Sequence, residues 1–268
     1  MNYLKEIWKY YFKSFAWLAF FVCIPVLFIG LILHPFKMIE FLAFYPGREF
    51  NSFGDFWNMV FDAGALPILC LIAGTVVLVV GICLLFGAVE KHFKTGKVSL
   101  KNDFSLNSNL PSVALIMIIT LGICLLVNFV SLLLIYVVHF IFANNGVAIW
   151  VNIAFSYIVV LCAFMFLIRV FSVASLTCVE MLLNGSPFKN SFSDALSSLD
   201  RAGWSLRFFE ILVFTIIVGL VLASAYLGLT WLGEMLSMFV LVPIECVMGM
   251  IVFFELNGLP RCDKKQLF

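Results

Sequence analysis

Residues 239–250 read FVLVPIECVMGM, an apolar stretch with a single carboxylate, Glu245, two residues after Pro243. The stretch lies in the middle of a longer apolar run, 234–255, and about 20 apolar residues are enough for an α-helix to cross the hydrocarbon core of a bilayer. An isolated segment in lipid must satisfy its own backbone hydrogen bonds, so we expect this run to be a helix. Glu245 would then lie near the middle of the bilayer.

The composition of the whole chain agrees with a membrane environment. Of its 268 residues, 64% are hydrophobic and 12% are charged, and the mean hydropathy is +1.13. Soluble domains are nearer half apolar and one quarter charged. The fold class is therefore predicted to be all-α, a polytopic membrane helical bundle. The net charge of +1 gives no reason to expect a nucleic-acid partner.

Six apolar runs are long enough to span a membrane, and they are too continuous for the strands of a barrel. We divide the chain into an amphipathic interfacial helix at 1–15, a six-span domain at 16–256 and a tail at 257–268. The predicted spans lie near 16–36, 66–89, 111–138, 148–172, 208–230 and 234–255.

Three further segments are predicted to lie on the membrane surface. In the N-terminal segment, Lys5, Lys9 and Lys13 recur every four residues opposite an apolar face, so we expect a helix over 2–14 with its rings in the acyl boundary. No small-residue cleavage site follows it, and we expect it to be retained. The aromatic segment 36–63 and the segment 190–201 are predicted to contain the other surface helices.

The third and fourth spans form a tight hairpin in this interpretation. The chain stays apolar for over thirty residues on each side of Asn144-Asn145-Gly146, which is a turn signal. Both helices would exceed the hydrocarbon thickness and must tilt, kink or protrude. Asn184-Gly185 is predicted to end the second of them.

Basic residues predict the orientation, because cytoplasmic loops carry an excess of Lys and Arg. Fourteen of the sixteen basic residues fall in segments on one side, and only Lys37 and Arg48 fall on the other. Both termini are therefore expected in the cytoplasm. The fourteen lie in the N-terminal segment, in 90–110, in 169–207 and in the tail.

A carboxylate at the bilayer centre costs about 2.5–3.5 kcal/mol on insertion scales. Glu245 could offset this cost by taking up a proton, by facing a wet cavity or by pairing with a cation, and Arg169 is the basic residue that could lie deep in a span. Asn128 and His139 are further intramembrane polar candidates. Pro243, like Pro25 in the first span, frees a backbone carbonyl about one turn earlier and is a candidate helix kink.

Two interpretations of these polar groups remain open. In the first, they are contacts that hold the bundle together, which are common between membrane helices. In the second, they form a proton- or ion-coupled substrate site at a broken helix. Gly74, Gly81 and Ala88, which recur every seven residues, indicate close helix packing.

Signatures of enzymes and metal sites are absent from the sequence. It contains no HExxH, GxSxG or P-loop motif, and His34, His92 and His139 lie far apart. Seven of the eight cysteines lie in apolar runs and suit packing. We therefore expect no enzymatic activity, no cofactor and no metal.

The stretch MLLNGSPFKNSFSDALSSLDRAGW, which leads directly into the next span, and the tail FFELNGLPR carry a family resemblance. They resemble the six-helix membrane domain attached to some bacterial glycerophosphodiester phosphodiesterases, and related stand-alone bacterial membrane proteins of uncharacterised function. The resemblance implies a bacterial inner-membrane bundle tied to lipid or envelope homeostasis. It carries over no catalytic residue, and the catalytic phosphodiesterase domain is not in this chain.

The sequence therefore supports two functional hypotheses. The first is a non-enzymatic integral membrane protein that binds lipid or scaffolds partners in the cell envelope. The alternative is a small secondary transporter or channel subunit with Glu245 as its coupling site. Membrane lipids are the expected partners, and six spans are compatible with a homo-oligomer or a complex with another membrane protein.

Overall fold

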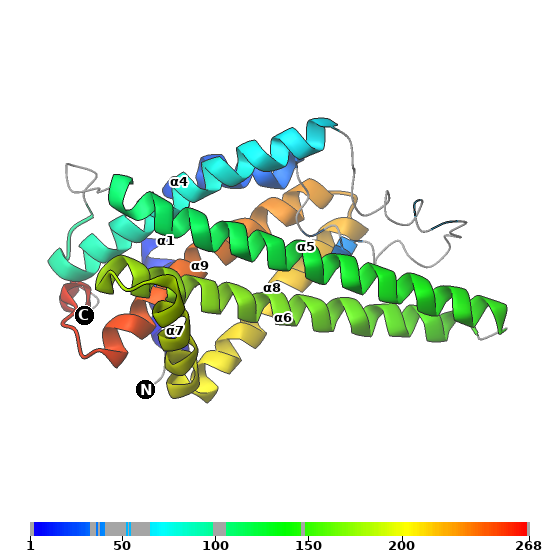
Figure 1. Cartoon of the computed structure of the whole chain (residues 1–268). Helices are drawn as coiled ribbons and strands as arrows, with labels where there is room; N and C mark the ends of the chain where they lie inside the picture. Colours follow the sequence, from blue (N-terminus) through cyan, green and yellow to red (C-terminus); the bar gives the residue numbers. More distant parts are fainter. Residues whose placement is uncertain are drawn as a thin grey trace.

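The computed structural model describes residues 3–32, 36, 38–40, 52, 54, 65–98, 106–145 and 148–266, and the regular structure in these residues is helical. The helices keep the labels of Figure 1. They are α1 (Tyr3–Ile32), α4 (Ala65–Thr95), α5 (Leu106–Asn144), α6 (Ile149–Asn184), α7 (Phe188–Ala202), α8 (Trp204–Tyr226), α9 (Thr230–Leu256) and the 3-10 helix η1 (Cys262–Gln266).

Five of the described helices, α4, α5, α6, α8 and α9, are long and apolar enough to cross a membrane. They correspond to the last five predicted spans, so the prediction of a helical membrane bundle is confirmed at this level. The first predicted span, 16–36, lies partly outside the described residues. The helix predicted over 190–201 is present as α7. Of the predicted surface segment 36–63, only four short pieces are described, including a helical turn at 38–40 and Phe36, whose ring packs against Phe164.

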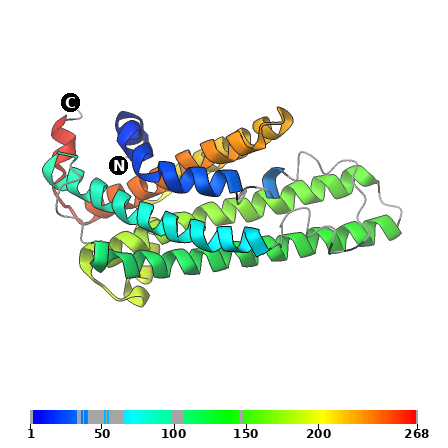
Figure 2. The ribbon, with the colours of Figure 1, turned by 90° about the horizontal axis from the view of Figure 1, so that it is seen from above.

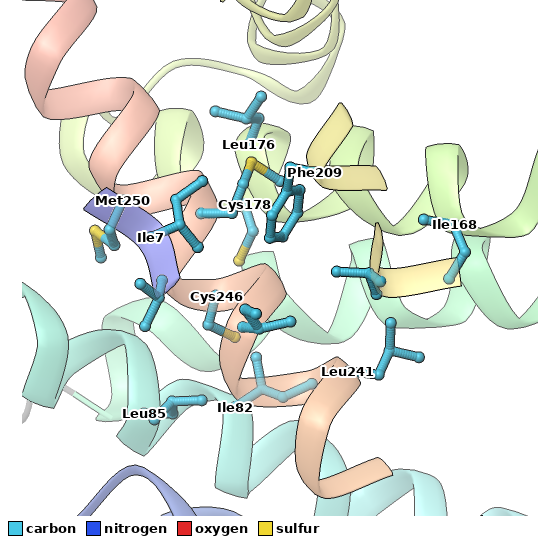
Figure 3. Close-up of a cluster of buried hydrophobic side chains, with 14 of the residues drawn as sticks. Ile7, Ile82, Leu85, Ile168, Leu176, Cys178, Phe209, Leu241, Cys246 and Met250 are labelled. Carbon is cyan, nitrogen blue, oxygen red and sulfur yellow. The ribbon is translucent and has the colours of Figure 1, made fainter. Parts of the chain in front are cut away.

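Helix α9 lies at the centre of the bundle. Every residue from Pro243 to Phe254 is buried, as expected for a helix that is covered on all sides by other helices. Figure 3 shows one side chain from each of five helices meeting here: Ile7, Ile82, Ile168, Phe209 and Cys246. The apolar run that includes Glu245 therefore faces protein over most of its length, not lipid.

Helices α5 and α6 form the predicted hairpin, and they are the longest helices described. With 39 and 36 residues, they measure about 58 and 54 Å at 1.5 Å per residue, well over the roughly 30 Å of a hydrocarbon core. In Figures 1 and 2 the end of α5 and the start of α6 extend beyond the other helices, at the opposite end of the bundle from the two chain termini. Helix α6 ends at Asn184 as predicted, and Gly185 takes the left-handed conformation (φ 62°) that closes the helix.

The N-terminal segment is helical as predicted, but its surroundings differ from the expectation. It is continuous with the rest of α1, although Figure 2 shows the first turns at a steep angle to the remainder. The face expected to lie in lipid is covered by protein only in part: Ile7 and Tyr11 are at most 2% exposed, and Leu4 and Trp8 are half-buried. Phe12, at 68% exposure, is turned outward. Aromatic residues can serve the lipid interface or a protein interior equally well, and the periodicity alone does not distinguish the two.

The close packing predicted from small residues in the second span is confirmed at Gly81. A Cβ atom at Gly81 would lie 2.9 Å from Pro25 Cγ and 3.2 Å from the backbone oxygen of Phe21. The glycine therefore allows α4 to approach the part of α1 that Pro25 occupies. Gly74 and Ala88 of the same stripe are also buried.

Candidate functional site

Glu245 lies where α9 packs against α6 and α8, and it is 5% exposed. Ser172 on α6 donates a hydrogen bond to its Oε2 over 3.2 Å, and Ser175 donates to its backbone oxygen over 2.6 Å. Within the described part of the chain, Oε1 of Glu245 has no hydrogen-bond partner. The carboxyl group is therefore only half satisfied in a place without access to bulk water.

The close approach of α6 and α9 makes these two hydrogen bonds possible. A Cβ atom at Gly249 would overlap the hydroxyl of Ser175, so this pair sets the separation of the two helices. Small residues allow membrane helices to pack tightly, and short hydroxyl side chains can then bond across the interface. The glycine one turn after Glu245 thus positions Ser175 and Ser172 beside the acid.

Arg169 does not pair with Glu245, although the sequence allowed that pairing. Both side chains are described, and the ion pairs of Arg169 are with Glu210 on α8 (Nη1 to Oε1, 2.7 Å) and Asp200 on α7 (3.9 Å). Glu210 is 3% exposed and lies close enough to Glu245 for their carboxyl groups to interact electrostatically. The structure thus adds Glu210, the ion-pair partner of Arg169, to the buried acids of this part of the bundle.

These four charged groups form a series from the interior to the surface. Glu245 and Glu210 are buried, the side chain of Arg169 is 31% exposed, and that of Asp200 is 76% exposed. We call Glu245, Glu210, Arg169 and Asp200 the charged series. Because Asp200 belongs to α7, the series ends at the surface on which that helix lies.

Pro243 has a specific partner. Proline has no N–H to donate to the carbonyl four residues earlier, which here is that of Phe239. Tyr11 of α1 donates its hydroxyl hydrogen to this carbonyl over 3.2 Å. The carbonyl that the sequence predicted to be freed is therefore bonded to the N-terminal helix, and α9 stays helical through the proline.

Asn128 and His139 are not brought to Glu245. Asn128 donates to the backbone oxygen of Cys124 in its own helix over 2.9 Å. His139 bonds to the side chain of Asn152 across the α5–α6 hairpin. Asn152 lies twenty residues before Ser172 on α6, so the pair is roughly 30 Å from the Glu245 site along the helix. The Asn128 bond lies within α5, the His139 bond joins α5 to α6, and both are separate from the charged series.

A second polar cluster, which sequence reasoning missed, joins the chain ends. Arg261 makes two hydrogen bonds to Asp263 (3.1 and 2.8 Å) and further ion pairs with Glu6 (3.0 Å) and Glu255 (3.2 Å). Its guanidinium also lies over the ring of Phe93, 4.4 Å from the centroid. The sequence signal was Arg261 itself, which we counted as a marker of orientation and as part of the tail that carries the family resemblance.

The electrostatics of this cluster favour the charged state. Burial lowers the pKa of the Arg261 guanidinium, but its hydrogen bonds to Asp263 and the charges of Asp263, Glu6 and Glu255 outweigh burial and hold that pKa above its ordinary value. The cluster thus joins the first turns of α1, the end of α9 and the segment after it. It is a structural connection between the two ends of the chain.

No metal centre is found among the described residues, which contain no group of three or more His, Cys, Asp or Glu side chains placed to bind an ion. Comparisons of the chain with protein-family models, with curated proteins and with solved structures gave no match. The class is therefore set by the fold: a multi-pass α-helical integral membrane protein with a buried charged series.

Proposed function

We propose that the chain is a non-enzymatic integral membrane protein that binds lipid within the cell envelope. In this proposal it has six spans, both termini are cytoplasmic, and the membrane is the inner membrane of a bacterium, in line with the positive charges on one side and with the resemblance stated above. The observation that carries the proposal is the surface of the α5–α6 hairpin.

Large apolar side chains cover the hairpin outside the bundle. Ile118 and Leu126 on α5 and Ile158 on α6 are between 62% and 63% exposed. Soluble proteins rarely expose continuous apolar areas of more than a few hundred Å², so acyl chains or apolar partner helices must cover this surface. The hairpin is longer than a bilayer core is thick, which gives lipid an extended apolar contact on two antiparallel helices that lie side by side.

The test is phospholipid retention, measured by native mass spectrometry of the purified protein through successive detergent washes. We expect Ile118→Ser with Leu126→Ser to release lipid earlier than wild type. Ile211→Ser with Leu212→Ser on α8, where both residues are also exposed, is the matched control and should retain lipid like wild type. Equal retention in all three proteins would reject the hairpin as the lipid site.

A second candidate function is favoured by a different observation, the unpartnered Oε1 of buried Glu245. Ionisable groups kept inside a membrane are costly and often belong to ion or proton pathways. A small secondary transporter or channel subunit would use Glu245 as its coupling site. This function predicts pH-dependent flux in proteoliposomes that Glu245→Gln abolishes, and normal flux in that variant would reject it. The lipid-binding function predicts that Glu245→Gln leaves lipid retention unchanged.

A further inference from the structure

The junction of α7 and α8 carries exposed charged and aromatic side chains that the sites described above do not use. Arg201 lies in the last turn of α7, Gly203 follows the helix with a positive φ of 62°, and α8 begins at Trp204. Arg207 lies in the first turn of α8. Trp204 is 73% exposed, and both arginines are exposed as well. We call Arg201, Trp204 and Arg207 the basic corner.

The basic corner lies at the depth of the lipid headgroups. Helix α8 is long and apolar enough to span a membrane, and its 23 residues measure about 35 Å. A hydrocarbon core is about 30 Å thick, so the first turn of a spanning α8 falls at its edge. Figure 1 shows α7 at a steep angle to α5 and α6, as expected for a helix on the membrane surface. The hydroxyl of Ser205 accepts a hydrogen bond from the backbone N–H of Leu4 over 3.2 Å, which fixes the corner beside the start of α1.

Apolar side chains next to the basic corner suit contact with acyl chains. Phe192 and Leu196 are exposed on α7, although the opposite face of that helix is buried. On α8, Phe208 is 58% exposed directly after Arg207. The guanidinium carbon of Arg207 lies 5.4 Å from the ring centroid of Trp204. Tryptophan beside a cation is typical of the boundary between acyl chains and headgroups, where the ring meets lipid and the charge meets phosphate.

The positive charges of the basic corner are not neutralised by acids of the described structure. Neither Arg201 nor Arg207 forms an ion pair with a described residue. Asp200, the neighbour of Arg201 in the chain, pairs with Arg169 over 3.9 Å. Asp194 precedes Arg201 by seven residues, about 10 Å along the axis of α7. Two unpaired cations at the edge of a bilayer attract an anion from the headgroup layer.

We propose that the basic corner binds the phosphate of an anionic phospholipid, with Arg201 and Arg207 supplying the positive charge and Trp204 contacting the upper part of the acyl chains. The occupant is a lipid because the corner combines headgroup depth, unpaired cations and exposed apolar side chains. This inference goes beyond the proposed function, from which it takes only that lipid is the ligand. The hairpin surface contacts acyl chains of any phospholipid, whereas the basic corner selects the charge of the headgroup.

Native mass spectrometry of the purified full chain tests the proposal. The protein is released from micelles that contain equal amounts of phosphatidylglycerol, which is anionic, and phosphatidylcholine, which is zwitterionic, with identical acyl chains. We expect wild type to retain more phosphatidylglycerol. One arginine near anionic headgroups contributes about a fivefold preference, so the ratio of bound phosphatidylglycerol to phosphatidylcholine should fall roughly 25-fold in Arg201→Gln with Arg207→Gln.

Two further variants separate the site from net charge and from folding. Lys94→Gln with Lys97→Gln is the matched control, because it removes the same charge from two exposed side chains at the end of α4. Lys94 is already paired with Glu90 over 2.6 Å, and the control should keep the wild-type ratio. Arg201→Lys with Arg207→Lys keeps both charges and should keep most of the preference, which distinguishes the loss of charge from a loss of folded protein.

Equal binding of the two lipids by wild type would overturn the proposal, and so would a loss of preference in the Lys94 and Lys97 control. A lysine variant as unselective as the glutamine variant would show that charge is not the cause. A wild-type dimer that the glutamine variant dissociates, with no preference between the lipids, would identify a second copy of the chain as the occupant and overturn the lipid site.

The proposed function is judged by a different variant of the same protein. Ile118→Ser with Leu126→Ser on the hairpin should release lipid early and still prefer phosphatidylglycerol among the lipid that remains. Wild-type retention in this variant, with the headgroup preference intact, rejects the hairpin and supports the basic corner. Early release together with a lost preference supports the hairpin and overturns the basic corner as a separate site.

Discussion

Tyr11 and Pro243 should be energetically coupled, because the tyrosine bonds to the carbonyl that the proline leaves without its helical donor. Tyr11→Phe keeps the buried ring and removes only the hydroxyl group. A hydrogen bond contributes a net ~0.5–1.5 kcal/mol, and a buried acceptor left unsatisfied costs ~1–3 kcal/mol. The O···O distance of 3.2 Å is long for a hydroxyl donor, so we expect a loss of about 1 kcal/mol in the free energy of unfolding.

In a Pro243→Ala background, residue 243 regains an N–H that can donate to the carbonyl of Phe239. Tyr11→Phe should then cost close to nothing, which gives a coupling free energy of about 1 kcal/mol in the double-mutant cycle. The assay is reversible unfolding of the purified protein in mixed micelles with increasing SDS, with helix content followed by circular dichroism.

Tyr10→Phe is the matched control. Tyr10 is also fully buried, and its hydroxyl bonds to Nδ1 of His92 over 2.7 Å, away from Pro243. Its loss should cost about 1 kcal/mol in either background, since no group in its hydrogen bond changes with the proline. A cycle in which Tyr11→Phe and Pro243→Ala are additive would show that the bond to the Phe239 carbonyl does not compensate for the proline.

Three further substitutions test the packing and the ion pairs by the same unfolding assay. Arg169→Gln leaves buried Glu210 without its cation and should cost about 3 kcal/mol, part of which Glu210→Gln restores; full additivity would contradict the pairing. Arg261→Lys keeps the charge but loses the bidentate hydrogen bonds to Asp263 and the contact with the Phe93 ring, and should lower the free energy of unfolding by about 2 kcal/mol. Wild-type stability of this variant would show that the charge alone suffices. Gly249→Ala overpacks the interface between α9 and α6 and should lower the free energy of unfolding by ~1–3 kcal/mol. The control is Gly219→Ala, whose added methyl group meets open space, so this change should be neutral or slightly stabilising. Equal effects of the two substitutions would contradict the close approach of α6 and α9.

The helices were predictable because hydropathy in a membrane protein is a strong signal. Of the last five predicted spans, three fall within observed helices. The span 148–172 begins one residue before α6 (Ile149–Asn184), and 208–230 runs past the end of α8 (Trp204–Tyr226). The length of an apolar run reflects the thickness of the hydrocarbon core that it crosses. The helix itself can be longer, because it ends only where turn residues stop it. Asn184-Gly185 stopped α6 well past the predicted span, and that signal was also in the sequence.

The candidate site was only partly predictable. An acid within an apolar run is recognisable, so Glu245 was identified, but its neighbours depend on how helices are rotated against one another. Apolar faces of membrane helices look alike, and nothing in the sequence distinguished Glu245 from Glu210 as the partner of Arg169. Glu210 stands three residues after Arg207, inside the predicted fifth span, and could have been found by listing every acid in a span.

The polar and irregular groups of α9 explain how one arrangement of helices can be specified in lipid. Apolar side chains alone give little preference for one helix contact over another, because lipid tails are as apolar as leucine. Three features of α9 have a partner on another helix: Tyr11 at the Phe239 carbonyl, Ser172 at Glu245 and Ser175 at Gly249. Sliding α9 by one turn would break all three contacts together and would remove the partners of a carbonyl and a carboxylate. The features that make FVLVPIECVMGM a poor lipid-facing helix are therefore the ones that fix its position in the bundle, and Glu245 alone among them keeps an oxygen without a partner in the described structure.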